Sequence, residues 1–258
     1  MRFPLRLSAA LFNRRIKNLF GSKEMSQPIF VFSPCATNQS PQFRSDEQSV
    51  GLEWHSPKEC VERLRAIDSP VVWLSGAEPL LHPEIGDVTD ALTENGRFVF
   101  LHTSGYGLRQ CIHEFRPNSR LFLTVEFAGR EEVHDRAVGR PGAFRRSIQA
   151  IRAAKLSGFL VAAHFSITAD SDPCEIGQLI ESLDNKDVDG FIVSRGGRTM
   201  SNAGKGDIEA LADVRALIRC GRWERFSQLL DDAYAEQQAL QEPAGIRASG
   251  ENAFEEGD

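Results

Sequence analysis

The chain has 258 residues, of which 41% are hydrophobic and 26% are charged, and its formal net charge is −6. This length suits one α/β domain with a sizeable core and terminal extensions. The negative charge excludes a general nucleic-acid binder, which is normally basic. The first 23 residues differ from the rest because they hold basic side chains and no acid: Arg2, Arg6, Arg14, Arg15, Lys17 and Lys23.

The five cysteines, at positions 35, 60, 111, 174 and 220, include no CxxC or CxxxC pair. This odd and scattered set indicates reduced thiols in a cytoplasmic protein rather than a disulfide framework. No apolar run approaches the length of about 18 residues that spans a bilayer. Basic residues also interrupt the N-terminus where a secretory signal needs an apolar stretch. We therefore expect a cytoplasmic protein.

Residues 1–26 form a basic amphipathic segment, in which apolar side chains are interspersed with arginines from Phe3 to Phe20. Such a pattern is typical of a helix on an anionic membrane surface, so residues 1–23 are a candidate contact with the inner face of the membrane. The alternatives are a helix whose apolar side packs on its own domain and a frayed tail.

Strands and helices alternate along residues 27–198. Apolar stretches predict six strands, at 28–33, 71–75, 97–102, 121–127, 159–167 and 190–194. Helical patterns lie between them, at 57–67, 84–95, 143–156 and 174–184, and Ser56-Pro57-Lys58-Glu59 has the form of a helix N-cap. Nearly continuous apolar strands separated by helices indicate parallel pairing with the helices outside.

The C-terminal part has a different pattern. Residues 199–240 are predicted as a helical extension, with one amphipathic stretch over 207–240. Its apolar side chains are expected to pack on the barrel: Leu211, Val214, Leu217, Ile218, Trp223, Phe226 and Leu230. Residues 241–258 are acidic and poor in apolar side chains, which predicts a disordered tail.

Motifs at the predicted strand ends resemble those of the radical S-adenosylmethionine (SAM) superfamily, in the same order. Gly76-Ala77-Glu78-Pro79 resembles its Gly-Gly-Glu-Pro, His102-Thr103-Ser104-Gly105 its Thr-Asn-Gly turn, and Val125-Glu126-Phe127-Ala128-Gly129 its Val-Ser-Leu-Asp-Gly. Glu132-Val133-His134-Asp135, with Gly139, Gly142 and Phe144, resembles the signatures at its fourth helix. The resemblance implies an α/β fold, a partial (β/α)6 barrel of the radical SAM type with C-terminal helices. The likeness is greatest to the hopanoid branch, of the adenosylhopane synthase type, over residues 28–197.

One motif of the superfamily is missing. The superfamily holds a [4Fe–4S] cluster with three thiolates of a CxxxCxxC loop after the first strand. Here that loop contains Cys35 alone. The resemblance therefore implies that a [4Fe–4S] cluster is not held in the usual way and that reductive cleavage of SAM is not expected. Ala77 stands in place of the second glycine of Gly-Gly-Glu-Pro, and Ala128 in place of the aspartate of the fourth-strand motif. Together with the missing cysteines, these changes indicate a site that no longer carries out the chemistry of the superfamily.

Parallel barrels bind ligands at the carboxyl ends of their strands. The residues predicted there are Cys35, Ser75, Gly76, Glu78, Thr103, Ser104, Glu126, His164, Ser194 and Arg195. By resemblance, residual SAM binding is assigned to Gly76, Ala77, Glu78, Pro79, Thr103 and Ser104. The alternative is that Glu78 orders its own loop.

Glu126 and His164 are the candidate catalytic residues, because both are expected to face inward. A carboxylate beside an imidazole can bind a metal or exchange a proton, whereas a buried pair that fills a vacated cavity is the alternative. The sequence by itself assigns no metal site. His102 lies near the same rim, but strand alternation leaves its direction open, and His82, His113 and His134 are interpreted as caps or surface groups.

Two functions compete at this point. The leading hypothesis is a non-catalytic paralogue that binds a ligand or a protein partner, linked only by resemblance to hopanoid or other isoprenoid-lipid metabolism. The alternative is an enzyme, either a radical SAM enzyme with non-standard cluster ligands or one with another activity at Glu126 and His164. A folded remnant without a role is a third interpretation.

Overall fold

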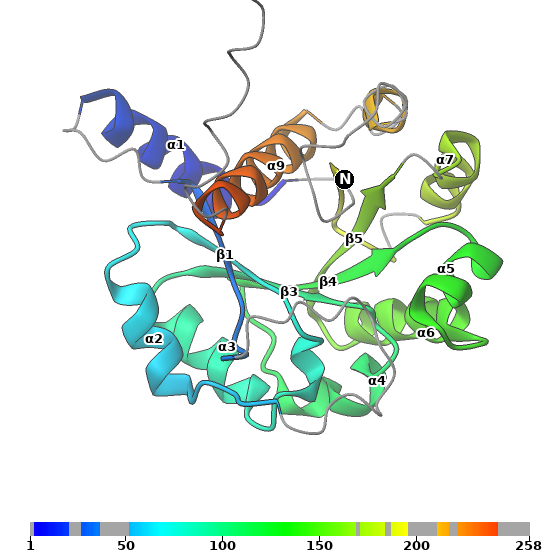
Figure 1. Ribbon diagram of the computed structural model, residues 1–258, viewed down its shortest axis with the longest axis horizontal. Helices are drawn as coiled ribbons and strands as arrows, with labels where there is room; N and C mark the ends of the chain where they lie inside the picture. Colours follow the sequence, from blue (N-terminus) through cyan, green and yellow to red (C-terminus); the bar gives the residue numbers. More distant parts are fainter. Residues whose placement is uncertain are drawn as a thin grey trace, which may run out of the picture.

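The computed structural model describes residues 3–20, 27–36, 52–168, 171–183, 187–195, 211–216 and 221–241. Its centre is one sheet of six parallel strands in the order β1-β2-β3-β4-β5-β6 (Figure 1). The strands are β1 (Ile29–Phe32), β2 (Val71–Leu74), β3 (Phe98–Thr103), β4 (Leu121–Phe127), β5 (Leu160–Ile167) and β6 (Gly190–Arg195). Sheet order follows chain order, so each connection crosses over through helical residues. The predicted partial (β/α)6 barrel is confirmed.

The helices are α1 (Leu5–Phe20), α2 (Pro57–Arg65), α3 (Ile85–Glu94), α4 (Leu108–Cys111), α5 (Glu131–Val138), α6 (Ala143–Leu156), α7 (Pro173–Ser182) and α9 (Arg222–Gln241). Single 3-10 turns cover Pro79–Leu81 and Ile112–Glu114, and residues 211–216 are helical. The Ser56 hydroxyl accepts a hydrogen bond from the Glu59 amide, while the Glu59 side chain accepts one from the Ser56 amide. This reciprocal capping box begins α2 at the predicted residue.

The convex face of the sheet is apolar, with aliphatic side chains and phenylalanines. Leu74, Leu101 and Leu123 are fully buried there, together with apolar side chains from α2, α3, α6 and α7. Every second residue of a strand points to the same face, so these positions alternate with those of the opposite face. Helices on this side shield the strands from water, as Figure 1 shows for α2, α3, α4 and α6.

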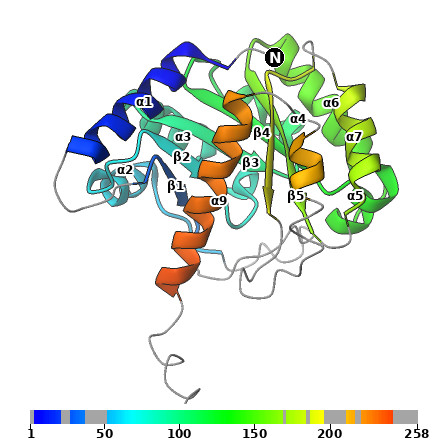
Figure 2. The ribbon, with the colours of Figure 1, turned by 90° about the horizontal axis from the view of Figure 1, so that it is seen from above.

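The concave face is covered by α9 and by the start of the chain. Helix α9 contacts both β6 and β1, which lie at opposite edges of the sheet (Figure 2). Trp223 and Phe226 of α9 are buried against Phe100 and Phe122, and the Phe3 ring lies 4.8 Å from the Trp223 ring. Burial of large aromatic rings is a strong source of stability, so α9 belongs to the core.

Helix α1 lies beside α9 on the same side of the sheet (Figure 1). Leu7 is fully buried, and Arg14 is buried and pairs with Asp68. Of the interpretations of the N-terminal segment, docking on its own domain is therefore observed for one side of the helix. Among the described residues, no helix is both long enough and apolar enough to cross a membrane.

Residues 207–240 are predicted to be helical, and the described part of this range contains two helical stretches, at 211–216 and in α9. Gly221, directly before α9, has a φ of +46°, a left-handed conformation that does not continue a helix. Leu211 and Val214 join the convex core, whereas Trp223 joins the concave one. The break therefore lets the two stretches pack on opposite faces.

The sequence patterns also missed α4 and α5 as separate helices, because both are too short to show a clear helical period. The predicted tail, 241–258, lies outside the described residues except for Gln241. The same is true of 37–51 in the loop after β1 and of 196–198 after β6.

Candidate functional site

The loop after β2 is built by a close approach to the end of β1. Gly76 has a φ of +108°, and a Cβ added there would lie 2.6 Å from the Ser33 Oγ. Both observations require glycine for the packing of this chain itself. Ala77, at the position where the superfamily has its second glycine, is 1% exposed, so its methyl group is buried within the protein.

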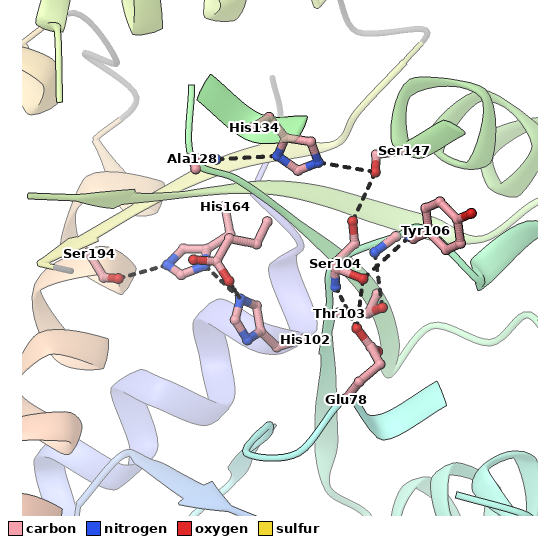
Figure 3. Close-up of polar contacts among 12 residues, drawn as sticks. Glu78, His102, Thr103, Ser104, Tyr106, Ala128, His134, Ser147, His164 and Ser194 are labelled. Carbon is pink, nitrogen blue, oxygen red and sulfur yellow. Dashed lines mark hydrogen bonds and ion pairs between the residues drawn. The ribbon is translucent and has the colours of Figure 1, made fainter. Parts of the chain in front are cut away.

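Glu78 connects this loop to the end of β3. Its Oε1 accepts a hydrogen bond from the Leu80 amide, while its Oε2 accepts from the Ser104 amide at 2.9 Å and from the Ser104 hydroxyl at 2.8 Å (Figure 3). The Thr103 hydroxyl accepts from the Gly105 amide at 3.0 Å. These bonds support the interpretation that Glu78 orders its own loop, which is what a carboxylate at the start of a helical turn commonly does.

A second set of contacts extends from the same loop to α6. The Ser147 hydroxyl donates to the Ser104 carbonyl at 2.9 Å and lies 3.5 Å from the His134 Nε2. The His134 Nδ1 accepts from the Ala128 amide at 3.5 Å. His134 therefore caps the turn after β4 as predicted, but it is buried rather than a surface group, and so is His82.

The other cluster lies on the concave face, where His102 of β3 and His164 of β5 point toward each other (Figure 3). Glu126 of β4, the strand between them, is the third member. The His102 Nε2 is 3.2 Å from the Glu126 Oε2 and 2.9 Å from the His164 Nδ1. On the far side, the His164 Nε2 is 2.7 Å from the Ser194 hydroxyl of β6. Glu126 and His164 are register partners of adjacent strands, as their predicted inward direction requires.

Burial disfavours charge on both Glu126 and His164, with opposite outcomes. For His164, burial and the neighbouring His102 outweigh the attraction to Glu126 and lower the pKa to about 3, so this imidazole is neutral at pH 7. For Glu126, burial opposes ionisation, but hydrogen bonds from His102 and Ser166 outweigh it and lower the pKa to about 2. The cluster thus combines a carboxylate with a neutral imidazole.

His102 and Ser194 complete this cluster, although the sequence did not assign them to it. A usable signal was present for His102, because Phe98, Phe100 and His102 share one face of β3 by alternation. Tyr234 of α9 also comes near, and burial raises the pKa of its phenol. No sequence pattern indicates Tyr234, since its place depends on how α9 crosses the sheet.

Other predicted residues do not join the cluster. The Arg195 amide donates to Asp231 of α9 at 2.9 Å, which ties the end of β6 to that helix. Cys35 is buried and forms an antiparallel bridge with Trp54. The carboxyl ends of the strands therefore carry two separate sets of polar contacts. One is the Glu78–Ser104 network in the loops after β2 and β3, and the other is the histidine–carboxylate cluster on the concave face.

The described cysteines lie in different environments. Cys35 and Cys60 are buried and Cys111 is half-buried, and burial raises the pKa of the Cys60 thiol to about 11 and also raises that of Cys111. Cys174 is exposed on α7. Within the described ranges, the one group of three side chains placed to hold a metal is His102, Glu126 and His164, which contains no sulfur.

Known proteins were compared with this chain at the level of sequence and of fold. An AdoMet-dependent heme synthase of Methanosarcina barkeri (strain Fusaro / DSM 804) is 31% identical over 104 residues, which are 40% of this chain and 30% of the synthase. The chain thus corresponds to less than a third of that relative's length.

Two solved structures of SuiB from Streptococcus suis share the fold. The structure bound to S-adenosylmethionine has a TM-score of 0.56 at 12% identity and covers 74% of this chain and 46% of SuiB. The structure bound to the precursor peptide SuiA has a TM-score of 0.57 at 14% identity, with 88% and 50% covered. At such identities the likeness shows the fold alone.

The sequence profile of the radical SAM superfamily matches residues 34–169, more than half of the 258-residue chain. This range begins just after β1 and ends just after β5, so it includes the carboxyl ends of β2 to β5. The chain therefore belongs to the radical SAM superfamily.

Proposed function

We propose that this chain is a radical SAM superfamily member without a cluster of its own, and that it acts by binding a ligand or a protein partner. The arrangement of the cysteines is the observation that supports this most. Cys35 is the single cysteine between residues 34 and 59, so the loop after β1 does not have the three cysteines of CxxxCxxC spacing. Soft thiolate ligands are what such a cluster needs.

Anaerobic reconstitution with iron and sulfide tests this proposal. Gln39 and Gln42 occupy the positions that CxxxCxxC spacing gives its second and third cysteines after Cys35. The double variant Gln39→Cys/Gln42→Cys is therefore a matched positive control. We expect cluster absorbance at about 400 nm in the double variant and not in the wild type. A stoichiometric [4Fe–4S] signal in the wild type would contradict the proposal and favour an enzyme with non-standard ligands.

S-adenosylmethionine is the first ligand to test at the loop of Gly76–Pro79 with Thr103 and Ser104. Support comes from the fold shared with SuiB, which has been solved with SAM bound. Titration calorimetry should give a heat of binding that the Ser104→Ala variant weakens. An absence of heat and of thermal shift in the wild type would remove SAM from the proposed function.

A lipid-related role is the proposed biological setting, on the basis of the hopanoid-branch likeness of residues 28–197. The heme synthase similarity supports a tetrapyrrole as the competing ligand. Thermal unfolding with a hopene and with an iron porphyrin separates the two, because a ligand that binds only the folded chain raises its midpoint. Stabilisation by the porphyrin alone would overturn the lipid assignment.

We further propose that α1 contacts an anionic membrane. The side of this helix that does not pack on the domain exposes Leu5, Phe12 and Ile16, at 66%, 63% and 39%. Their spacing places them along one helix face, and the arginines of the same segment complement anionic lipids. This surface is separate from the side on which Leu7 is buried.

Flotation with anionic vesicles tests the membrane contact. Deletion of the N-terminus is unsuitable, because Phe3 and Leu7 belong to the core. We expect the triple variant Leu5→Ser/Phe12→Ser/Ile16→Ser to lose most of its vesicle binding. Leu156→Ser is the matched control, since Leu156 is 90% exposed on α6. Equal recovery of all three proteins in the soluble fraction would reject this contact.

A further inference from the structure

Three potential metal ligands converge on the concave face from adjacent strands. One ligand atom from each of His102, Glu126 and His164 lies within 4.8 Å of the others. Parallel strands hold these side chains in register, so their positions are fixed by the sheet rather than by a loop. Sites on rigid strands keep ligand geometry more accurately than sites on loops.

One proton at most is shared among the facing atoms of this cluster. A neutral imidazole has one N–H. When the proton of His164 is on Nε2, it points to the Ser194 hydroxyl 2.7 Å away, and Nδ1 is a lone pair. That lone pair and the Glu126 Oε2 both face the His102 Nε2, at 2.9 and 3.2 Å, so a proton on this nitrogen is shared between two acceptors. A divalent cation in place of that proton would bond to all three atoms at once.

Two of the three separations also match coordination to one ion. Two ligands at about 2.1 Å from a divalent ion, at angles of about 90–110°, lie about 3.0–3.4 Å apart. The measured 2.9 and 3.2 Å are close to this range. Two imidazoles and one carboxylate are a common protein ligand set for zinc and for non-haem iron.

Neighbouring side chains orient the three potential ligands and limit the space around them. Ser194 holds the ring of His164 from its non-ligating side, and Ser166 bonds to Glu126, as outer residues do in metal sites. The Trp73 ring lies 5.1 Å from the His102 ring and 5.2 Å from the His164 ring. The side chains of His102 and Glu126 are each 12% exposed, which leaves an approach for an ion.

We propose that His102 through Nε2, Glu126 through a carboxylate oxygen and His164 through Nδ1 bind one divalent transition-metal ion. Three protein ligands leave coordination positions open for water or for an oxygen atom of a bound ligand. This site uses none of the cysteines, so it is independent of whether the chain holds an iron–sulfur cluster.

Calorimetry with Zn²⁺ on the chelator-stripped, full-length protein tests the site. We expect one ion per chain, and an affinity at least about 100-fold lower in Glu126→Gln and in His164→Gln. The outer-residue variant Ser194→Ala keeps all three ligands and should lose about tenfold. His113→Gln, which alters a histidine outside the cluster, is the matched control and should bind as the wild type does. Circular dichroism verifies that each variant is folded.

A spectroscopic readout separates this site from binding by cysteine. Co²⁺ in a nitrogen and oxygen site gives weak visible bands, whereas cysteine ligation adds an intense thiolate-to-metal band in the near ultraviolet. We expect no such band, and none of the signal should depend on Cys174. The proposal is overturned by an absence of stoichiometric binding, by equal affinity in all variants, or by a thiolate band.

Discussion

The convex and concave faces of the sheet differ in kind, although the same six strands supply both. The convex face combines aliphatic side chains with phenylalanines such as Phe127 and Phe165, and is covered mainly by the crossover helices. The concave face is aromatic around Phe100 and Phe122, and becomes polar toward the strand ends at His102, Glu126 and His164. One face is therefore specialised for packing, while the other has the groups from which chemistry or binding can arise.

What covers the two faces differs as well. The convex layer comes from the helices that the strand–helix alternation requires. The concave layer comes from α9 and Phe3, which are segments outside that alternation. The repeated units therefore form most of the outer core, to which Leu211 and Val214 are added, whereas terminal segments complete the inner one. Substitutions on each face can test this division.

The largest effect is expected where α9 enters the concave core. Trp223→Ala removes a fully buried ring and should lower the free energy of unfolding by about 3–5 kcal/mol, measured in urea. A Cβ at Gly190 would lie 2.2 Å from that ring, so Gly190→Ala should destabilise the wild type strongly and the Trp223→Ala variant much less. If the two substitutions lower the free energy of unfolding additively, α9 is not packed against Gly190 as described.

A comparable substitution on the convex face should have a different signature. Leu101 is fully buried there, and Leu101→Ala should cost about 2–5 kcal/mol by leaving a cavity. Because the buried tryptophans Trp73 and Trp223 lie on the other side of the sheet, the tryptophan bands of the near-ultraviolet circular dichroism should stay unchanged. A loss of that signal would mean that the two cores are not independent.

The polar part of the concave face should make stability depend on pH. The pKa of His164 is lowered from 6.5 to about 3 in the folded protein. Between these values the unfolded chain binds a proton that the folded chain does not, so stability falls as the pH falls. One such proton corresponds to about 1.4 kcal/mol per pH unit.

Glu126 acts in the same direction at lower pH, because its pKa is lowered from 4.5 to about 2 and its contribution is lost as the carboxylate is protonated. Urea unfolding in the presence of a chelator, at about pH 7.5 and at about pH 5, measures the slope. His164→Gln should flatten it, whereas His113→Gln should leave it unchanged. An equal slope in all three proteins would show that His164 is not buried in neutral form.

The smallest effect is expected at the Glu78 loop. In Glu78→Gln, the bonds to Ser104 lose their charge assistance, which should cost about 1 kcal/mol. For a chain of this size that lowers the unfolding midpoint by about 2–4 °C in a calorimetric scan. No change would mean that Glu78 does not order the loop, and the carboxylate would then be better explained by ligand binding.

Particular elements show which features could be predicted from sequence. The capping box at Ser56 and the helix end at Asn95 depend on neighbouring residues alone, and both were predicted. The separation of 211–216 from α9 reflects packing of the two stretches on different faces of the sheet. The periodicity of apolar residues along the sequence does not report on which face a helix packs. His134 was assigned correctly as a cap, but its burial beneath Phe127 and Phe144 is a tertiary property.

The sequence by itself determined the parallel barrel, because apolar strands with intervening helices and ordered strand-end motifs are local signals. It also determined that the chain contains no CxxxCxxC spacing. Only the tertiary structure decided that His102 and Ser194 join Glu126 and His164, because residues 62 positions apart meet through strand register. In the same way, only the crossing of α9 from β6 to β1 decided what covers the concave face, since that packing depends on shape and not on periodicity.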